Sequence, residues 1–349
     1  MRSAQLLPLV LASSSIPAAL GATLPDFFRL SSRSGSAVEL QKPAVSPPFS
    51  EDVQDKDLRA DLPTRQWRFE PWPTFWMPKY CREEAVINQL QPADFEVRDV
   101  WYEDCAAAWT ICRHRGAKEP WDGILETLSQ VPVGMRQHVA NLVILPGRTS
   151  DASATSNAAA YTRGSVLVFT PSFFKLGVLF HEFTHILDMV ALQTVVKSHG
   201  YAEGTAFSET KLWARAYGND SAVPTAYART SWQEDFADAG RWALSDMTHA
   251  GGLSVYSPGW RACAHQIAAY KAWLGELVFP RDGVCSGKID TSPAVPVVAA
   301  AKPPPGAGGA AAQKMPGSGL QGTKVKKIVM PKGAENMLWV YHGPAPGTQ

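Results

Sequence analysis

The spacing of apolar side chains predicts a mixture of short strands and helices in the middle of the chain. Two apolar runs rich in branched residues, 140–146 and 165–169, predict strands. The segment between them, 147–164, is small and polar and predicts a long loop. Helical spacing predicts four helices, at 122–131, 173–196, 231–245 and 261–277. Strands and helices that alternate in this way indicate an α+β fold.

The two ends of the chain lack these patterns. Residues 1–21 combine an early arginine, an apolar stretch and small residues before a cleavage site, as a secretory signal peptide does. Residues 22–65 are rich in Pro, Ser and charge, which predicts a flexible leader or pro-segment. Residues 289–349 form a Pro/Gly/Ala-rich low-complexity tail, with a possible short strand near its end. One compact domain, 66–288, is expected between two disordered segments.

Composition and charge narrow the classes of partner. The 349 residues are 45% hydrophobic and 19% charged, which is ordinary for a globular protein. A net charge of +1 gives no electrostatic footprint for nucleic acid. No apolar run approaches the roughly 20 residues that span a bilayer. We therefore expect a secreted, extracellular monomer with no nucleic-acid or membrane partner.

The cysteines and one sequon fit an oxidising compartment. Asn219 begins an Asn-Asp-Ser sequon and is a candidate for glycosylation. An oxidising environment favours disulfides, and the odd count leaves one thiol free. We expect one pair between Cys263 and Cys285 and one pair within the early group. The five candidates are Cys81, Cys105, Cys112, Cys263 and Cys285.

A metal-binding pattern lies on the strongly apolar helix expected at 173–196. The sequence HEFTH places His181 and His185 about 40° apart on one helix face, with Glu182 about 100° round from His181. Two imidazoles one turn apart can reach one zinc ion, and the glutamate can reach a water bound to it. Asp188 lies close to the same face. The alternative is a surface helix on which the histidines pair with Glu182 or Asp188.

A catalytic zinc site needs a third protein ligand, and the helix at 231–245 offers candidates. Glu234 and Asp238 lie one turn apart on a shared face, which Asp235 shares less well. Glu234 as the ligand and Asp238 as acceptor of a histidine ring N–H would complete the set. The alternative is that Glu234 caps its own helix, because Ser231 to Glu234 also forms a capping box.

These two segments resemble a known family. HEFTHILD, followed about 40 residues later by YARTSWQEDFADA, is similar to the catalytic domain of anthrax lethal factor and the related secreted Pro-Pro endopeptidases. The chain also resembles fungal secreted proteins labelled conidiation-specific. The resemblance implies a zincin-like α+β domain with a small mixed sheet and an active-site helix that carries HExxH.

The resemblance also implies an activity and roles for single residues. It implies a secreted zinc endopeptidase with one zinc ion and a protein or peptide substrate. His181, His185 and Glu234 would bind the zinc, and Glu182 would be the general base. Tyr227 would donate to the developing oxyanion, and the alternative is a plain packing tyrosine. The side chains expected to support the ligands from behind are Asp188 and Asp238.

Two other functions stay open at this point. A second zincin group uses an Asp ligand in a GTxD pattern, but Gly204-Thr205 is followed by Phe207 where that Asp would stand. A secreted binding protein with little turnover is the other alternative. For an enzyme, element order predicts that the second strand is a sheet edge on which an extended substrate pairs. Its residues are Ser165, Val166, Leu167, Val168 and Phe169.

Overall fold

The computed structural model describes residues 40–146, 160–170, 174–298 and 338–341. The chain divides into two units, 1–33 and 34–349, and all the described residues belong to the second unit. The expected signal peptide, 1–21, lies outside the described residues. In the described part of the chain, no helix combines the length and the apolar character that crossing a bilayer requires.

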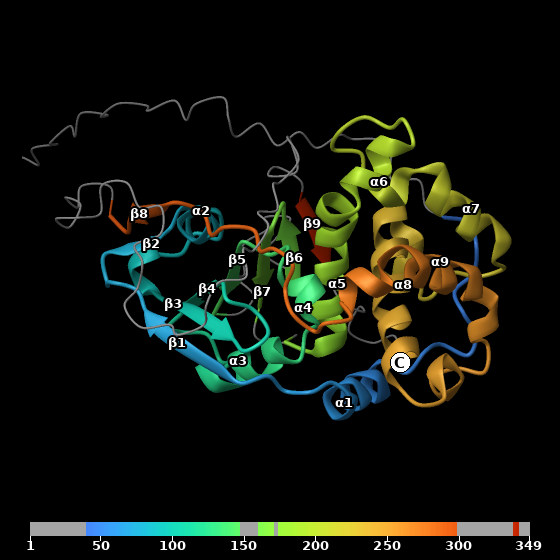
Figure 1. The fold of residues 1–349 in the computed structure, drawn as a ribbon, viewed down its shortest axis with the longest axis horizontal. Coiled ribbons are helices and arrows are strands. Elements are labelled where there is room, and N and C mark those ends of the chain that lie inside the picture. Colours follow the sequence, from blue (N-terminus) through green and yellow to red (C-terminus); the bar gives the residue numbers. More distant parts are fainter. Residues whose placement is uncertain (1–39, 147–159, 171–173, 299–337, 342–349) are drawn as a thin grey trace, which may run out of the picture. The chain divides into compact units, whose positions relative to one another are not determined.

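The described residues form a mixed α+β structure (Figure 1). The strands are β1 (Trp67–Pro71), β2 (Trp76–Pro78), β3 (Phe95–Tyr102), β4 (Trp109–His114), β5 (Asn141–Ile144), β6 (Ala160–Arg163), β7 (Val166–Phe169), β8 (Ala294–Pro296) and β9 (Leu338–Tyr341). The α-helices are α1 (Glu51–Asp61), α2 (Lys79–Ile87), α3 (Trp121–Ser129), α4 (Val133–Arg136), α5 (Leu176–Ile186), α6 (Gln193–Ser198), α7 (Lys211–Asn219), α8 (Trp232–Thr248) and α9 (Ala264–Val278). A π-helical turn, Leu187–Ala191, lies between α5 and α6. Short 3₁₀ helices are Pro92–Asp94, Phe207–Glu209, Tyr227–Thr230, Gly252–Val255 and Trp260–Cys263.

Seven strands form one mixed sheet in the order β1-β3-β4-β5-β7-β6-β9, while β2 and β8 pair separately. β4, β5 and β7 run parallel, and the pairs on either side of them are antiparallel. Every residue of β5 and β7 is buried. Strands covered on both faces read as continuous branched apolar runs, which is why the sequence revealed these two.

The expectation that residues 165–169 form a sheet edge is wrong. β7 pairs with β5 on one side and with β6 on the other, so no substrate can add to it as a neighbouring strand. β6 lies inside the expected loop and turns into β7 through Gly164, whose φ of 59° suits a glycine. Its four residues, AYTR, are too few to show a period. β9 lies beside β6, in the segment where a terminal strand was considered possible.

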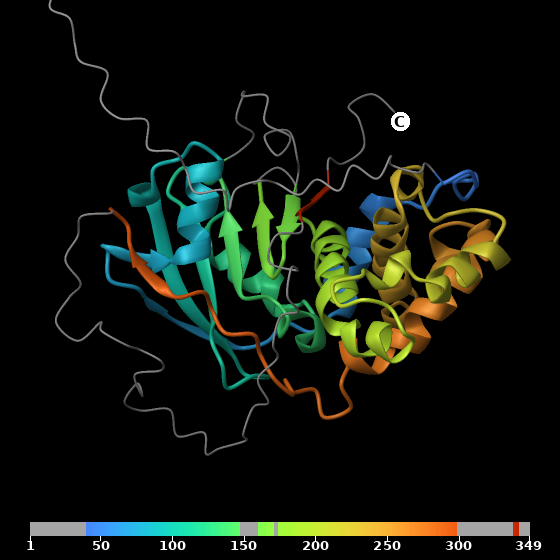
Figure 2. The same ribbon diagram turned by 90° about the horizontal axis from the view of Figure 1, so that it is seen from above.

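α5 lies between the sheet and the helices α6 to α9, whereas α2 lies against β5 of the sheet (Figure 2). α5 contacts β6 on one side and α8 on the other, and α8 in turn contacts α9. All eleven residues of α5 are buried, so this helix runs through the core. The alternative of a surface helix with two paired histidines is therefore wrong.

The disulfides follow a different pairing from the one expected. Cys81 pairs with Cys112 within the early group, as predicted. Cys105 pairs with Cys285, and Cys263 is the buried free cysteine, so the expected Cys263–Cys285 bond is wrong. Cys263 lies just before α9, where its thiol donates to the carbonyl of Trp260. The physical reason is that α9 carries Cys285 away from Cys263 and back toward the end of β3.

Folded structure extends beyond the expected domain 66–288 at both ends. Residues 40–62 fall inside the expected flexible leader, yet Phe49, Leu58 and Leu62 are buried in the main core. α1 packs against both α5 and α8. At the other end β8 pairs with β2. The leader is therefore folded from residue 40 onward, because its sparse apolar side chains find their partners on distant helices.

Candidate metal centre

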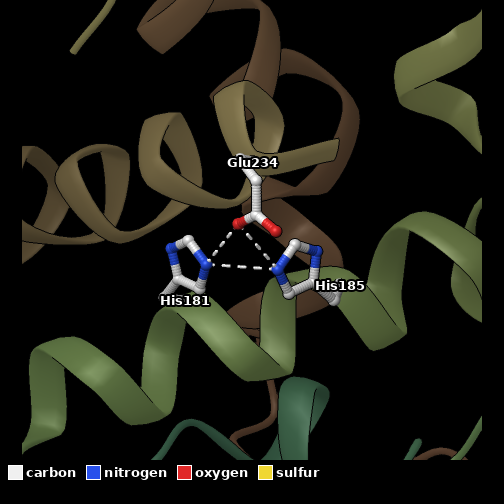
Figure 3. Close-up of side chains that lie close together, drawn as sticks. All are labelled: His181, His185 and Glu234. Atoms are coloured by element: carbon white, nitrogen blue, oxygen red, sulfur yellow. Dashed lines mark hydrogen bonds and ion pairs between the residues drawn. The ribbon is translucent and has the colours of Figure 1, made fainter. Parts of the chain in front are cut away.

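The two histidines of HEFTH project from α5 toward the first turn of α8 (Figure 3). Both are completely buried. Their Nε2 atoms lie 3.1 Å apart, as the one-turn spacing on a helix predicts. Two imidazole nitrogens this close in a buried place can share at most one proton between them, so the pair is suited to hold a cation.

Glu234 brings the third group from α8. Its Oε2 lies 2.9 Å from Nε2 of His181 and 3.3 Å from Nε2 of His185. The cap of α8 is the side chain of Ser231, whose Oγ accepts the backbone N–H of Glu234 at 3.1 Å. The side chain of Glu234 is thereby left to face the histidines, where the positive end of the α8 dipole favours a carboxylate.

The three atoms fit the edges of a zinc coordination polyhedron. Zinc holds nitrogen and oxygen ligands at about 2.0–2.2 Å, so neighbouring ligand atoms of a tetrahedron lie about 3.3 Å apart. The separations of 3.1, 2.9 and 3.3 Å lie close to that value. In the described part of the chain these three residues are the group of His, Cys, Asp and Glu side chains arranged to hold a metal ion.

Asp238 orients His181 from behind. Its Oδ1 lies 2.9 Å from Nδ1 of His181, which fixes the ring and directs Nε2 toward the other two groups. The same carboxylate accepts a hydrogen bond from the hydroxyl of Thr225 and forms an ion pair with Nε of Arg241 at 2.9 Å. The expected contact of Asp238 with a histidine ring is therefore present, and its support of a metal ligand stays a prediction.

The charges of the site depend on this arrangement. Burial alone would lower the pKa of His181, but the hydrogen bonds to Asp238 and Glu234 outweigh it and raise that pKa to about 9. Burial lowers the pKa of His185, so this ring stays neutral. Burial would raise the pKa of Glu234, but its interactions with His185 and His181, hydrogen bonds among them, lower it to about 2. A proton on His181 thus balances the carboxylates at neutral pH.

Glu182 lies beside the group with an unsatisfied carboxyl. It is completely buried, and neither of its oxygens has a hydrogen-bond partner among the described residues. Desolvation raises its pKa well above the ordinary value, partly offset by the charge of His181. A buried polar group without a partner is costly, and such groups gather at functional sites.

Tyr227 lies at the edge of the same group. It begins the 3₁₀ helix that precedes α8 and is half-buried, with its ring centroid 5.8 Å from that of His181. Thr225 connects this turn to the site, because its Oγ1 accepts the backbone N–H of Tyr227 at 3.1 Å and its hydroxyl donates to Asp238. Its expected role as an oxyanion donor stays a prediction.

Two acidic residues near the site have other partners. Asp188, expected to support a ligand, instead accepts hydrogen bonds from the backbone N–H and the hydroxyl of Ser208, at 2.8 and 2.7 Å. It lies in the π-helical turn that follows α5 and anchors the 3₁₀ helix Phe207–Glu209. Asp235 accepts from Trp213 Nε1 at 2.9 Å and from Gln266, which agrees with its poorer alignment on α8.

Several other expected features lie away from the site. Phe207, the residue at the Asp position of the alternative GTxD pattern, packs against Phe236 in the core. Asn219, the candidate for glycosylation, is exposed at the end of α7, and its modification stays a prediction.

Sequence reasoning missed three residues that support the site. Thr225 and Arg241 flank Asp238, and Glu51 from α1 accepts a hydrogen bond from Arg241 at 2.6 Å. Arg241 carried one signal, because a charge three residues after Asp238 on an otherwise apolar helix face suggests a buried ion pair. Glu51 carried none, since its partner is 190 residues away.

Comparison with known proteins assigns the family. Residues 53–315 match the model of the family described as conidiation-specific protein Con-13. Conidiation-specific protein 13 of Neurospora crassa is 29% identical over 226 residues, which cover 63% of this chain and 59% of that protein. No solved structure matches.

These matches correct the expected function. They are to conidiation-specific proteins, and the assignment to the lethal factor and Pro-Pro endopeptidase group is therefore wrong, as is the zinc endopeptidase function drawn from it. That assignment depended on two short segments, whereas the family match spans most of the chain. The chain belongs to the Con-13 family of conidiation-specific proteins.

Proposed function

We propose that this protein binds one zinc ion through His181, His185 and Glu234. The observation that carries the proposal is the convergence of two Nε2 atoms and one carboxylate oxygen at separations of 2.9 to 3.3 Å, all in buried side chains. Two imidazoles and one carboxylate suit zinc, whereas calcium and magnesium prefer sites made of oxygen alone. Asp238 adds the acceptor that ligating histidines require.

Metal content and stoichiometry test this proposal directly. The full chain, loaded with zinc and dialysed, should retain one zinc per molecule by native mass spectrometry. His185→Ala and Glu234→Ala should lose it, while His199→Ala, which removes an exposed histidine at the end of α6, should not. A wild-type protein that retains no zinc, or retains it equally well in the two site variants, would show that these residues do not form the metal site.

The position of Glu182 favours hydrolytic chemistry as a second proposal. Three protein ligands are typical of catalytic rather than structural zinc, and zinc bound in this way acidifies a water molecule. Glu182 has two unpartnered, buried oxygens and interacts electrostatically with both His181 and Glu234. Its carboxylate could accept a proton in this enclosed place and return it to a leaving group. Peptide bonds are not part of this proposal, because the family match is to conidiation-specific proteins.

A small activated ester separates zinc binding from hydrolysis. The zinc-loaded wild type should hydrolyse p-nitrophenyl acetate faster than the chelator-treated protein. Glu182→Gln should keep the zinc and lose most of this rate, because general acid–base groups typically contribute about 10²–10⁴-fold. Equal rates for the Glu182→Gln variant and the wild type, both loaded with zinc, would exclude Glu182 as the proton acceptor.

A further inference from the structure

The N-terminal strap, which we define as residues 40–62, contacts every element that carries the metal centre. Figure 1 shows its helical part, α1, against α5 and α8. The contacts are made by named polar groups as well as by packing. They fall into two parts, an extended part before α1 and α1 itself.

The extended part holds the loop that leads to Tyr227. Val223 is paired on both sides, since Val45 donates to its carbonyl and its own N–H donates to Pro43, both at 2.9 Å. Lys42 donates to carbonyls at the C-terminal end of α7, where the helix dipole favours a cation. Leu40 donates to the carbonyl of Arg229 at 2.8 Å. The strap therefore fixes the residues on both sides of Thr225 and Tyr227.

α1 holds the two helices that supply the ligands. Asp55 Oδ1 accepts the first backbone N–H of α5, that of Leu176, at 2.6 Å. Gln54 Nε2 donates to Oγ of Ser245 at 2.8 Å and to the carbonyl of Arg241 at 3.2 Å. Before α1, Phe49 stacks on Trp242 with ring centroids 4.3 Å apart. These contacts fix α5 and α8 relative to each other.

A continuous chain of charged groups runs from α1 to the metal centre. Glu51 Oε1 accepts from Arg241 Nη2 at 2.6 Å, Arg241 Nε pairs with Asp238 Oδ1 at 2.9 Å, and Asp238 Oδ1 lies 2.9 Å from Nδ1 of His181. Arg241, Asp238 and His181 are buried, whereas the Glu51 side chain is 40% exposed. Among these four described residues, Glu51 of the strap is therefore the one whose side chain is exposed to solvent.

We propose that the strap positions the metal ligands, with Glu51 as a positioning residue that acts on His181 through Arg241 and Asp238. This inference rests on the proposed zinc site. Without Glu51 the guanidinium of Arg241 can turn away from Asp238, and Asp238 then holds the ring of His181 less firmly. Residues 40–62, which the sequence predicts as part of a flexible leader or pro-segment, would then help to hold the metal ligands in place.

Zinc affinity of matched α1 variants tests the inference. Glu51→Gln is the test, and Asp52→Asn is the control because Asp52 forms an ion pair with Lys175 at 2.9 Å without reaching the network. Groups that contact a ligating histidine typically change metal affinity about 10–100-fold, so Glu51, two contacts further out, should change it about three- to tenfold. The probe is zinc chloride in competition with a chromogenic chelator. Equal affinities of the two variants would overturn the inference.

A double-variant cycle and a metal-free measurement complete the experiment. In an Arg241→Met background, Glu51→Gln should cause no further loss of affinity, whereas additive losses would contradict action through Arg241. In ¹⁵N-histidine-labelled protein without zinc, the Nδ1–H signal of His181 should broaden in Glu51→Gln and persist in Asp52→Asn. An unchanged His181 signal in Glu51→Gln would overturn the inference about the strap, whether or not the wild type binds zinc. A wild type that binds no zinc would refute only the zinc proposal.

Discussion

Zinc uptake should release a proton, because the metal must replace the one on His181. The pKa of His181 is raised to about 9, since its bonds to Asp238 and Glu234 outweigh the effect of burial. At pH 7 a group with that pKa is almost fully protonated, and removing its proton costs about 3 kcal/mol, or about a hundredfold in zinc affinity. We therefore expect zinc affinity to rise about tenfold per pH unit between pH 6 and 8.5 and to level off near pH 9.

Titration calorimetry in buffers of different ionisation enthalpy measures this release. At least one proton should leave per zinc bound at pH 7, and a second where the zinc charge also ionises Glu182, whose pKa burial raises. Asp238→Asn removes one of the groups that raise the pKa of His181 and should reduce both the release and the pH slope. A wild-type affinity that is flat from pH 6 to 8.5, with no proton released, would refute the reasoning about His181.

Three further predictions concern the framework around the site. A Cβ on Gly240 would lie 2.6 Å from Oγ1 of Thr184, so Gly240→Ala should push α8 from α5, lower the free energy of unfolding by about 1–3 kcal/mol and weaken zinc binding; an unchanged urea midpoint would contradict this. Replacing the Cys105–Cys285 pair by serines opens a 180-residue loop and should cost about 5 kcal/mol, against about 4 kcal/mol for the 31-residue Cys81–Cys112 loop. The opposite order of melting temperatures would argue against the loop-entropy account. Ser231→Ala should cost about 1 kcal/mol through loss of the α8 cap, and Ser231→Gly only a few tenths; an unchanged midpoint of chemical denaturation in Ser231→Ala would show that the cap bond contributes little.

Local patterns predicted the parts of this structure that depend on neighbouring residues. The branched run at β5, the apolar helix that carries HEFTH and the face shared by Glu234 and Asp238 all follow from periods of a few residues. The hydrogen bond from His181 to Asp238 also follows, once two helices are assumed to meet. Helical geometry fixes such relations before any tertiary contact forms.

Features that depend on the path of the chain between elements could not be read in this way. Cys263 and Cys285 are close in sequence, but α9 lies between them and separates them, so the nearer pairing was wrong. β7 looked like an edge because β6, its neighbour, is four residues long and follows a polar segment. In both cases one element, α9 or β6, determines which residues are neighbours in space. The distance between residues along the sequence does not reveal this.

The leader is a related case with a different cause. Residues 40–62 contain few apolar side chains, and their mean character is polar, so composition alone predicted flexibility. Phe49, Leu58 and Leu62 are nevertheless buried, because α5 and α8 supply the rest of the core. A short segment can fold with little apolar surface of its own when a preformed neighbour covers it. The composition of a segment does not report the apolar surface that neighbouring elements provide.

The cap of α8 comes from the side chain of Ser231, and the side chain of Glu234 faces the histidines instead of the cap. The sequence allowed the Glu234 side chain either to cap α8 or to bind a metal, and one side chain cannot do both. In the structure the backbone N–H of Glu234 donates to Oγ of Ser231, while its carboxylate faces His181 and His185. The capped turn also holds the carboxylate at the positive end of the α8 dipole, where a negative charge is favoured. The capping signal in the sequence is therefore compatible with the proposed ligand role, since the capped turn is the one from which the carboxylate reaches the histidines.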